Sequence, residues 1–176
     1  LVGCGVRALD PAFVHGDAGL HGGDVVEAGG LEVRVVATPG HTADSLSLLV
    51  RDPDAGSLVL TGDTVLGRGT TVVAHPDGRL ADYLDSLRHL RDLAERHDAE
   101  VILPGHGPVL GDALGAISFY LGHRAERLDQ VRAALAAGDM TPRQVVERVY
   151  ADVDPILWPA AELSVRAQLD YLGAHG

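Results

Sequence analysis

Three side chains of metal-binding type lie in short turns that contain glycine: His41, Asp63 and His106. Neutral imidazole and carboxylate are the ligands that zinc takes when no thiolate is available. A single histidine beside a glycine is usually an ordinary turn residue, but three such residues in the same local setting favour a shared function. The pattern therefore predicts a zinc site to which these three residues contribute.

Each of these turns follows a predicted strand. Four segments are expected to be strands, because their apolar residues alternate with polar ones or run together until glycine or proline stops them: residues 31–35, 45–51, 57–61 and 101–103. The second and third form a predicted hairpin, and the first, third and fourth lead into His41, Asp63 and His106. Because loops at one edge of a rigid sheet commonly carry functional side chains, we expect the three residues to face a common point.

Helices are predicted where apolar residues recur at helical spacing: residues 82–97, 112–138, 141–150 and 159–172. The second is expected as one long helix or as two helices broken near Gly122. The third opens with Thr141-Pro142-Arg143-Gln144, which has the order of a capping box with proline at the first helical position. These elements predict two domains, residues 1–125 and a small helical domain of residues 126–176.

The composition indicates a folded protein and argues against several functions. The chain has 176 residues, of which 46% are hydrophobic and 22% charged, and its formal net charge is -11. This acidic balance disfavours non-specific nucleic-acid binding. All basic residues are arginine, which excludes a Schiff-base lysine and a phosphate-loop lysine. Cys4 cannot form an internal disulfide and is expected to be an inert thiol, and no signal peptide or membrane span is evident, so we expect a cytoplasmic protein.

The three turns also carry a family resemblance. Thr38-Pro-Gly-His-Thr42, Thr61-Gly-Asp-Thr64 and Pro104-Gly-His-Gly107 resemble, in order and spacing, the later metal motifs of the metallo-β-lactamase superfamily. Leu66-Gly-Arg-Gly-Thr-Thr71 and His123-Arg124 resemble the β-lactamase-like protein 2 group of that superfamily. The resemblance implies an α+β fold, the C-terminal half of an αββα sandwich followed by a small winged-helix-like domain.

The resemblance also implies roles for the three residues. His41 would be a ligand of the first of two zinc ions, His106 a ligand of the second, and Asp63 the catalytic carboxylate that bridges both. Two such ions would activate a shared hydroxide that attacks an ester, thioester or phosphodiester. This chemistry needs no protein nucleophile, so the implied function is a zinc-dependent hydrolase.

One departure from the family pattern limits this interpretation. The superfamily takes its other ligands from a His-x-His-x-Asp-His run, which this sequence lacks, and His15 and His21 have the wrong spacing to replace it. We therefore expect the chain to be the C-terminal part of a longer protein and to be inactive alone. Residues 6–11 would then form the strand that follows the missing run.

Two other functions stay open at this point. The C-terminal helical domain could be a nucleic-acid-binding or ribonuclease-type module, with Arg143, Arg148 and Arg166 contacting phosphates, or the whole chain could be a non-catalytic remnant. The acidic composition favours a small-molecule substrate over nucleic acid, no membrane partner is expected, and the sequence makes no prediction of oligomeric state.

Four further side chains are candidates for structural roles. His123 and Arg124 would be either a buried polar pair that holds the metal loops or part of the wet face of their helix. Trp158 is expected to fill the core between the helical domain and the sheet. His75 is expected to be exposed.

Overall fold

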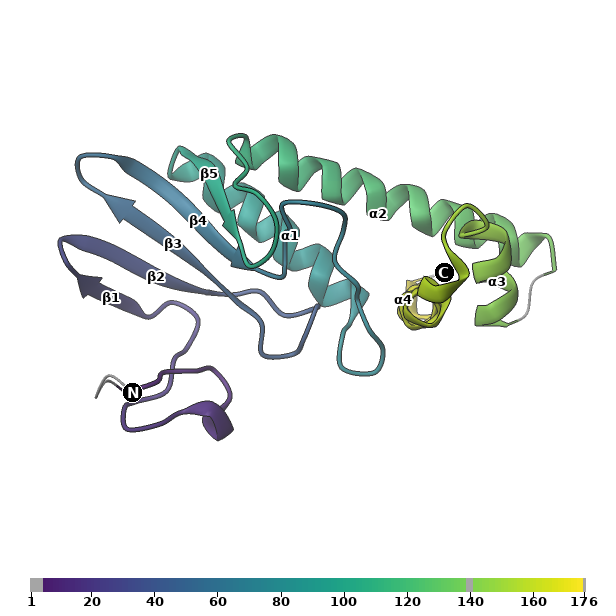
Figure 1. Ribbon diagram of the computed structural model, residues 1–176, viewed down its shortest axis with the longest axis horizontal. Helices are drawn as coiled ribbons and strands as arrows, with labels where there is room; N and C mark the ends of the chain where they lie inside the picture. The colour runs from purple at the N-terminus through teal and green to yellow at the C-terminus, as the bar shows by residue number, and fades with distance from the viewer. Residues whose placement is uncertain (1–4, 139–140, 176) are drawn as a thin grey trace.

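A computed structural model describes residues 5–138 and 141–175, so Cys4 lies outside the described residues (Figure 1). Its centre is a five-stranded sheet in the order β1-β2-β3-β4-β5. The strands are β1 (Val25–Ala28), β2 (Leu31–Ala37), β3 (Leu46–Asp52), β4 (Gly56–Gly62) and β5 (Ala99–Pro104). The four predicted strands are confirmed and β1 adds an edge that the sequence reasoning missed. Together with the helices below, the sheet confirms the predicted α+β class.

The strand expected at residues 6–11 is wrong. Val6 forms only an isolated antiparallel bridge with His15, and a short 3-10 helix, Pro11–Phe13, follows. The Asp10 carboxylate accepts a hydrogen bond from the Ala12 backbone N–H, and this cap together with Pro11 favours the helical turn over an extended chain.

The sheet topology brings three strand ends to one edge. β2 is antiparallel to β3 and β3 is antiparallel to β4, so β2 and β4 run in the same direction, and β5 is parallel to β4. The carboxyl ends of β2, β4 and β5 therefore lie at the same edge of the sheet. These are the ends that lead into the three predicted site residues.

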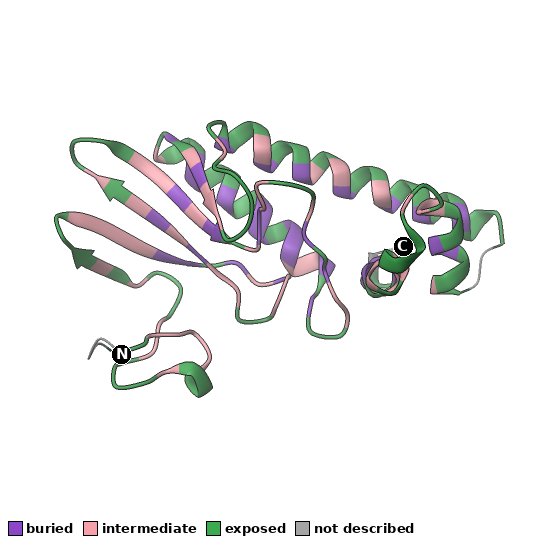
Figure 2. Cartoon of the chain, in the orientation of Figure 1, coloured by how far each residue is buried: buried purple, intermediate pink, exposed green. Residues whose placement is uncertain are grey.

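Two helices cover one face of this sheet. α1 (Leu80–Arg96) places its apolar residues on one side, and α2 (Ala113–Ala136) begins where the Asp112 carboxylate accepts a hydrogen bond from the Gly115 backbone N–H. α2 is unbroken at Gly122, so the single-helix alternative holds. The fully buried core side chains between helices and sheet include Leu49, Val59, Tyr83, Leu87, Leu90, Ile102 and Ile117. Figure 2 shows buried residues along α1 and within β3, β4 and β5.

The C-terminal helices form a second, smaller core. They are α3 (Pro142–Val149), a 3-10 turn (Pro155–Leu157) and α4 (Trp158–His175), and α3 opens with the predicted capping box. Val131, Val145, Val146 and Val165 are fully buried in this cluster, where α2, α3 and α4 meet (Figure 1). Ala167 on α4 belongs to the main core, so the two cores adjoin. The predicted domain boundary at 125 and 126 falls inside α2 and stays a prediction.

Trp158 does not reach the sheet. Its ring packs against the C-terminal cluster, its indole N–H donates to the Val153 carbonyl at 2.9 Å, and the Arg143 guanidinium lies 4.6 Å from the ring centre. The expected role between the two regions is therefore wrong, because the 3-10 turn directs the ring toward α3. In the described residues, no helix combines the length and the apolar character that a membrane span requires.

Candidate metal centre

The structure places His41 and His106 on opposite oxygens of Asp63. The distance from His41 Nε2 to Asp63 Oδ2 is 4.0 Å, and from His106 Nε2 to Asp63 Oδ1 it is 3.6 Å. His106 is the most open of the three, with a side chain that is 79% exposed, against 31% for His41 and 38% for Asp63. One carboxylate therefore lies between two imidazoles, and each imidazole faces a different oxygen.

The ring of His41 is oriented by a backbone carbonyl. Its Nδ1 lies 2.8 Å from the carbonyl oxygen of Val72, which can only accept a hydrogen bond. The proton of neutral His41 is thus held on Nδ1, and the lone pair of Nε2 is directed toward Asp63. Metal-binding histidines are commonly fixed in this way through their second ring nitrogen.

The turn before His41 requires glycine. Gly40 has a φ of 133°, and a Cβ atom at this position would lie 2.3 Å from the Cα of Tyr83 on α1. The Ser86 hydroxyl, one turn further along α1, donates to the Pro39 carbonyl at 2.8 Å. Because α1 contacts the backbone of this turn directly, the backbone that leads into His41 is held in place.

Asp63 and His106 are joined through the ends of β4 and β5. The Gly105 N–H donates to the Gly62 carbonyl at 2.7 Å, and a Cβ atom on Gly105 would lie 2.8 Å from Asp63 Oδ1. That oxygen is buried and has no hydrogen-bond partner in the structure. A buried carboxylate oxygen is normally paired, so the orphaned oxygen fits a site for a cation.

The loop after Asp63 is held by its own Thr71 and by a tyrosine from each of the two helices. The Thr71 hydroxyl donates to the Asp63 carbonyl at 2.5 Å, and the Tyr83 hydroxyl donates to the Thr64 carbonyl at 2.6 Å. The Tyr120 hydroxyl accepts from the Leu66 N–H at 2.8 Å. Burial raises the pKa of both tyrosines, which keeps their hydroxyls protonated as donors. Both lie within predicted helices, but the sequence analysis did not identify either as a contact of this loop.

The three predicted ligands are of types that bind zinc, and the two histidines face different oxygens of one carboxylate. His41 with Asp63 would serve one ion and His106 with Asp63 the other, so each ion has two protein ligands here. Within residues 5–138 and 141–175, no group of three or more His, Cys, Asp or Glu side chains is arranged to hold a metal ion. A structural zinc site takes four protein ligands and a catalytic site three, so further ligands are needed.

Other histidines lie apart from this centre. The His21 side chain is 81% exposed and lies 3.8 Å from Asp24, and the backbone of His15 pairs with Val6. His75 is only half-buried rather than fully exposed, and its Nε2 lies 3.2 Å from Asp170 on α4. These contacts give none of the three a place in the site.

The two neighbours on α2 differ in their surroundings. Arg124 is buried and donates to the Thr71 carbonyl, as expected for a residue that holds a metal loop. His123 is half-buried, stacks on Phe119 at 6.2 Å and leaves its Nδ1 without a partner. Burial, followed by the charge of neighbouring arginines, lowers the pKa of His123. The predicted pair is therefore one loop-holding residue and one separate histidine.

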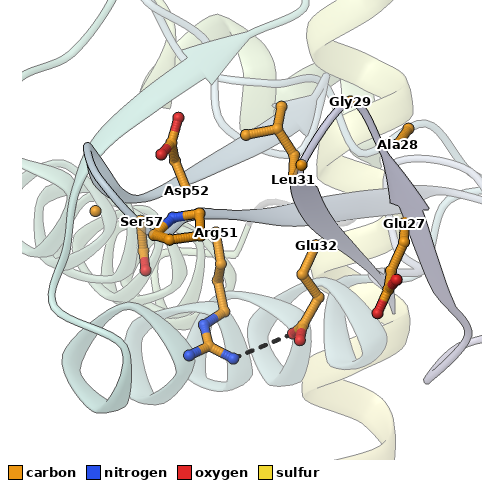
Figure 3. A pocket seen from close by; sticks show the side chains of 11 residues that line it. Glu27, Ala28, Gly29, Leu31, Glu32, Arg51, Asp52 and Ser57 are labelled. Carbon is orange, nitrogen blue, oxygen red and sulfur yellow. Dashed lines mark hydrogen bonds and ion pairs between the residues drawn. The ribbon is translucent and has the colours of Figure 1, made fainter.

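A hollow lies at the opposite end of the sheet from His41, Asp63 and His106 (Figure 3). It is bordered by the hairpin turns that precede β2 and β4, and its charged residues include Glu27, Glu32, Asp52 and Arg51. Arg51 is paired with Glu32 at 3.2 Å. None of the predicted site residues lines this hollow, so it is separate from the metal centre.

The sequence is similar to known families over most of its length. Residues 6–106 match the Metallo-beta-lactamase superfamily, and residues 141–176 match the Beta-lactamase associated winged helix domain. The Drosophila melanogaster protein named Beta-lactamase-like protein 2 homolog is 35% identical over 84% of this chain and 47% of its own length. The Atrochrysone carboxyl ACP thioesterase of Aspergillus fumigatus is 32% identical over 73% of this chain and 41% of its own length.

Solved structures show the same fold. A Beta-lactamase domain protein from Burkholderia ambifaria superposes with a TM-score of 0.77 and 28% identity, over 90% of this chain and 47% of that protein. The chain spans about half the length of the curated relatives it matches.

Proposed function

The chain belongs to the metallo-β-lactamase superfamily, with the associated winged helix, and from this premise we propose that it is the metal-bridging part of a zinc-dependent hydrolase. The expected resemblance to the β-lactamase-like protein 2 group is confirmed by the Drosophila relative. The observation that supports the proposed activity is the arrangement of Asp63, whose two oxygens face His41 and His106 separately. A carboxylate between two imidazoles is suited to bridge two ions.

Each residue contributes a distinct part of this function. Two bound zinc ions would acidify a water molecule toward neutral pH and polarise the oxygen of the scissile group. Asp63 supplies one negative charge between the two positions, which offsets the repulsion between cations. His41 is held in the tautomer whose Nε2 can bind a metal, and the open His106 leaves its side of the site accessible to a substrate.

Three ligands are too few for two ions, so we propose that residues 1–176 alone do not hydrolyse substrate. The remaining ligands would come from a segment with the His-x-His-x-Asp-His pattern of the superfamily. Among esters, thioesters and phosphodiesters, the thioester is the first to test, because the Aspergillus fumigatus relative is named a thioesterase. The net charge of -11 supports a small-molecule substrate over RNA.

The contacts of Arg143 weigh against the nucleic-acid alternative. Its guanidinium lies 2.8 Å from Glu147 and 3.2 Å from Glu162, and it stacks on Trp158. An arginine that is engaged by two carboxylates and an aromatic ring is poorly available to phosphate. The helical domain is therefore proposed as a packing partner of the hydrolase domain.

Zinc titration followed by imidazole NMR tests the proposed site. Zinc is expected to shift the ring nitrogen signals of His41 and His106, and Asp63→Asn is expected to weaken binding by at least tenfold, because it removes the charge shared by both positions. Asp92→Asn, on the exposed side of α1, is the matched control and should bind zinc as the unchanged chain does. Equal binding by both variants, or shifts confined to other histidines, would refute the metal site.

A hydrolysis assay then tests the activity. A thioester should be hydrolysed when residues 1–176 are joined to a preceding segment with the His-x-His-x-Asp-His run, and not by residues 1–176 alone. Turnover that persists in the joined protein after Asp63→Asn would refute the proposed role of Asp63.

A further inference from the structure

We infer that Arg124 on α2 is a positioning residue that fixes Asp63 and His41 through the loop segment Thr71-Val72. The inference rests on the proposed function, because it assigns a residue that prepares the metal site. Arg124 does not touch either site residue, and its effect is transmitted through the backbone of the loop.

The surroundings of Arg124 are unusual for a buried charge. Only 4% of the residue is exposed, and no carboxylate in the described part of the chain lies within ion-pair distance of its guanidinium. Its Nη2 donates to the Thr71 carbonyl, its guanidinium carbon lies 5.1 Å from the centre of the Tyr83 ring, and its Nε has no partner. Burial of a guanidinium is costly unless it is hydrogen-bonded. The Thr71 carbonyl is the group that accepts a hydrogen bond from this one.

The segment held by Arg124 contacts both site residues. The Thr71 hydroxyl donates to the Asp63 carbonyl at 2.5 Å, and the next carbonyl in the chain, that of Val72, accepts from His41 Nδ1 at 2.8 Å. Thr71 thus fixes the backbone of Asp63, the proposed bridging carboxylate, and Val72 fixes the tautomer of His41, the proposed histidine ligand. Without Arg124, the Thr71 carbonyl loses the donor that fixes this segment.

A purely structural role would stabilise the fold without changing the state of the His41 ring. Arg127, which follows Arg124 about one helical turn further along α2, provides the comparison. It donates to the Val149 carbonyl at 3.0 Å, and its guanidinium carbon lies 4.5 Å from the centre of the Tyr150 ring. It therefore makes the same kinds of contact as Arg124, but to the C-terminal helices. Arg127→Met is the matched control for Arg124→Met.

The test compares the imidazole nitrogens of His41 in each variant by NMR, without metal and at a pH where the ring is neutral. Arg124→Met is expected to reduce the fraction of His41 with its proton on Nδ1 and to weaken zinc binding by roughly 10- to 100-fold, the usual effect of losing a group that orients a metal ligand. Arg124→Lys, which keeps a donor and a charge, is expected to restore both in part. Arg127→Met should change neither.

The inference is overturned if Arg124→Met and Arg127→Met give the same His41 signals. If Arg124→Met does not fold, Thr71→Val decides, because it removes only the hydroxyl that donates to Asp63, and Thr71→Ser keeps that hydroxyl. Thr71→Val is expected to perturb the His41 signals and Thr71→Ser to leave them unchanged; equal effects overturn the inference. The metal-free tautomer is measured whether or not zinc binds, so failure of the proposed function is distinguished from failure of this inference.

Discussion

The hydroxyl of Tyr120 offers a sharp test of how α2 supports the loop after Asp63. It accepts a hydrogen bond from the Leu66 N–H at 2.8 Å and lies 3.0 Å from the Gly69 carbonyl and 3.3 Å from the Leu66 carbonyl. Its single proton can serve one carbonyl at a time. Tyr120→Phe keeps the ring of this residue, which is only 2% exposed, and removes the hydroxyl that contacts Leu66 and Gly69.

The expected loss of stability follows from the polar group that Tyr120→Phe leaves without a hydrogen-bond partner. Without the hydroxyl, the N–H of the half-buried Leu66 loses its hydrogen-bond partner. An unsatisfied group of this kind costs about 1–3 kcal/mol, so we expect the free energy of unfolding to fall by about 2 kcal/mol. For a chain of this size, each kcal/mol lowers the melting temperature by roughly 2–4 °C, which gives a decrease of roughly 4–8 °C.

Thermal unfolding followed by circular dichroism measures this change. Tyr150→Phe is the control, because its hydroxyl has no hydrogen bond within the described residues and its ring remains under Arg127. The control should stay within about 0.5 kcal/mol of the unchanged chain. If Tyr120→Phe melts at the same temperature as Tyr150→Phe, the hydroxyl does not stabilise the loop and the reasoning fails.

Two further predictions concern the site and the pH dependence of stability. Gly105→Ala would place a Cβ atom 2.8 Å from Asp63 Oδ1, so zinc titration should show weakened binding, whereas Gly111→Ala, whose Cβ would meet no atom within 4 Å, should bind normally. Burial lowers the pKa of His123 below its ordinary value of 6.5, so the unfolded chain takes up a proton more readily than the folded one. The free energy of unfolding should therefore fall as the pH drops through 6.5, and urea unfolding at several pH values should show a smaller fall for His123→Gln but not for the exposed His89→Gln.

Local sequence signals correctly predicted that His41, Asp63 and His106 follow strand ends at one edge of the sheet. Glycine ends each apolar run just before His41, Asp63 and His106, and proline precedes it at His41 and His106, so the strand ends could be predicted without knowledge of the fold. β1 was missed because its four residues are mostly exposed and show no alternation. It exists because Val25 to Ala28 pair with β2, a tertiary condition that the segment itself does not encode.

The support of the metal loop could not be predicted from local pattern. Tyr120 and Arg124 contact the loop across 51 to 54 residues of sequence, and the loop itself has no periodicity to read. The motif at residues 66–71 carried a family resemblance, but nothing in it indicated that Thr71 would contact the backbone of Asp63. Such contacts follow from the docking of α2 on the sheet, which sets the register between helix and loop.

The residues on the two faces of the sheet are relevant to the ligands that the proposed metal site lacks. Leu49 and Val59 are buried against the helices, while their neighbours Leu48, Val50 and Leu60 point to the opposite face and are only half-buried. A sheet that faces water usually alternates apolar with polar residues, so apolar residues on both faces indicate a sheet built to be covered twice. The proposed metal site needs additional ligands, and the half-buried apolar residues of the second face would suit a covering layer. A single further layer, as in the two-layered sandwich of the superfamily, would meet both requirements, which is why the hydrolysis test joins the chain to a preceding segment.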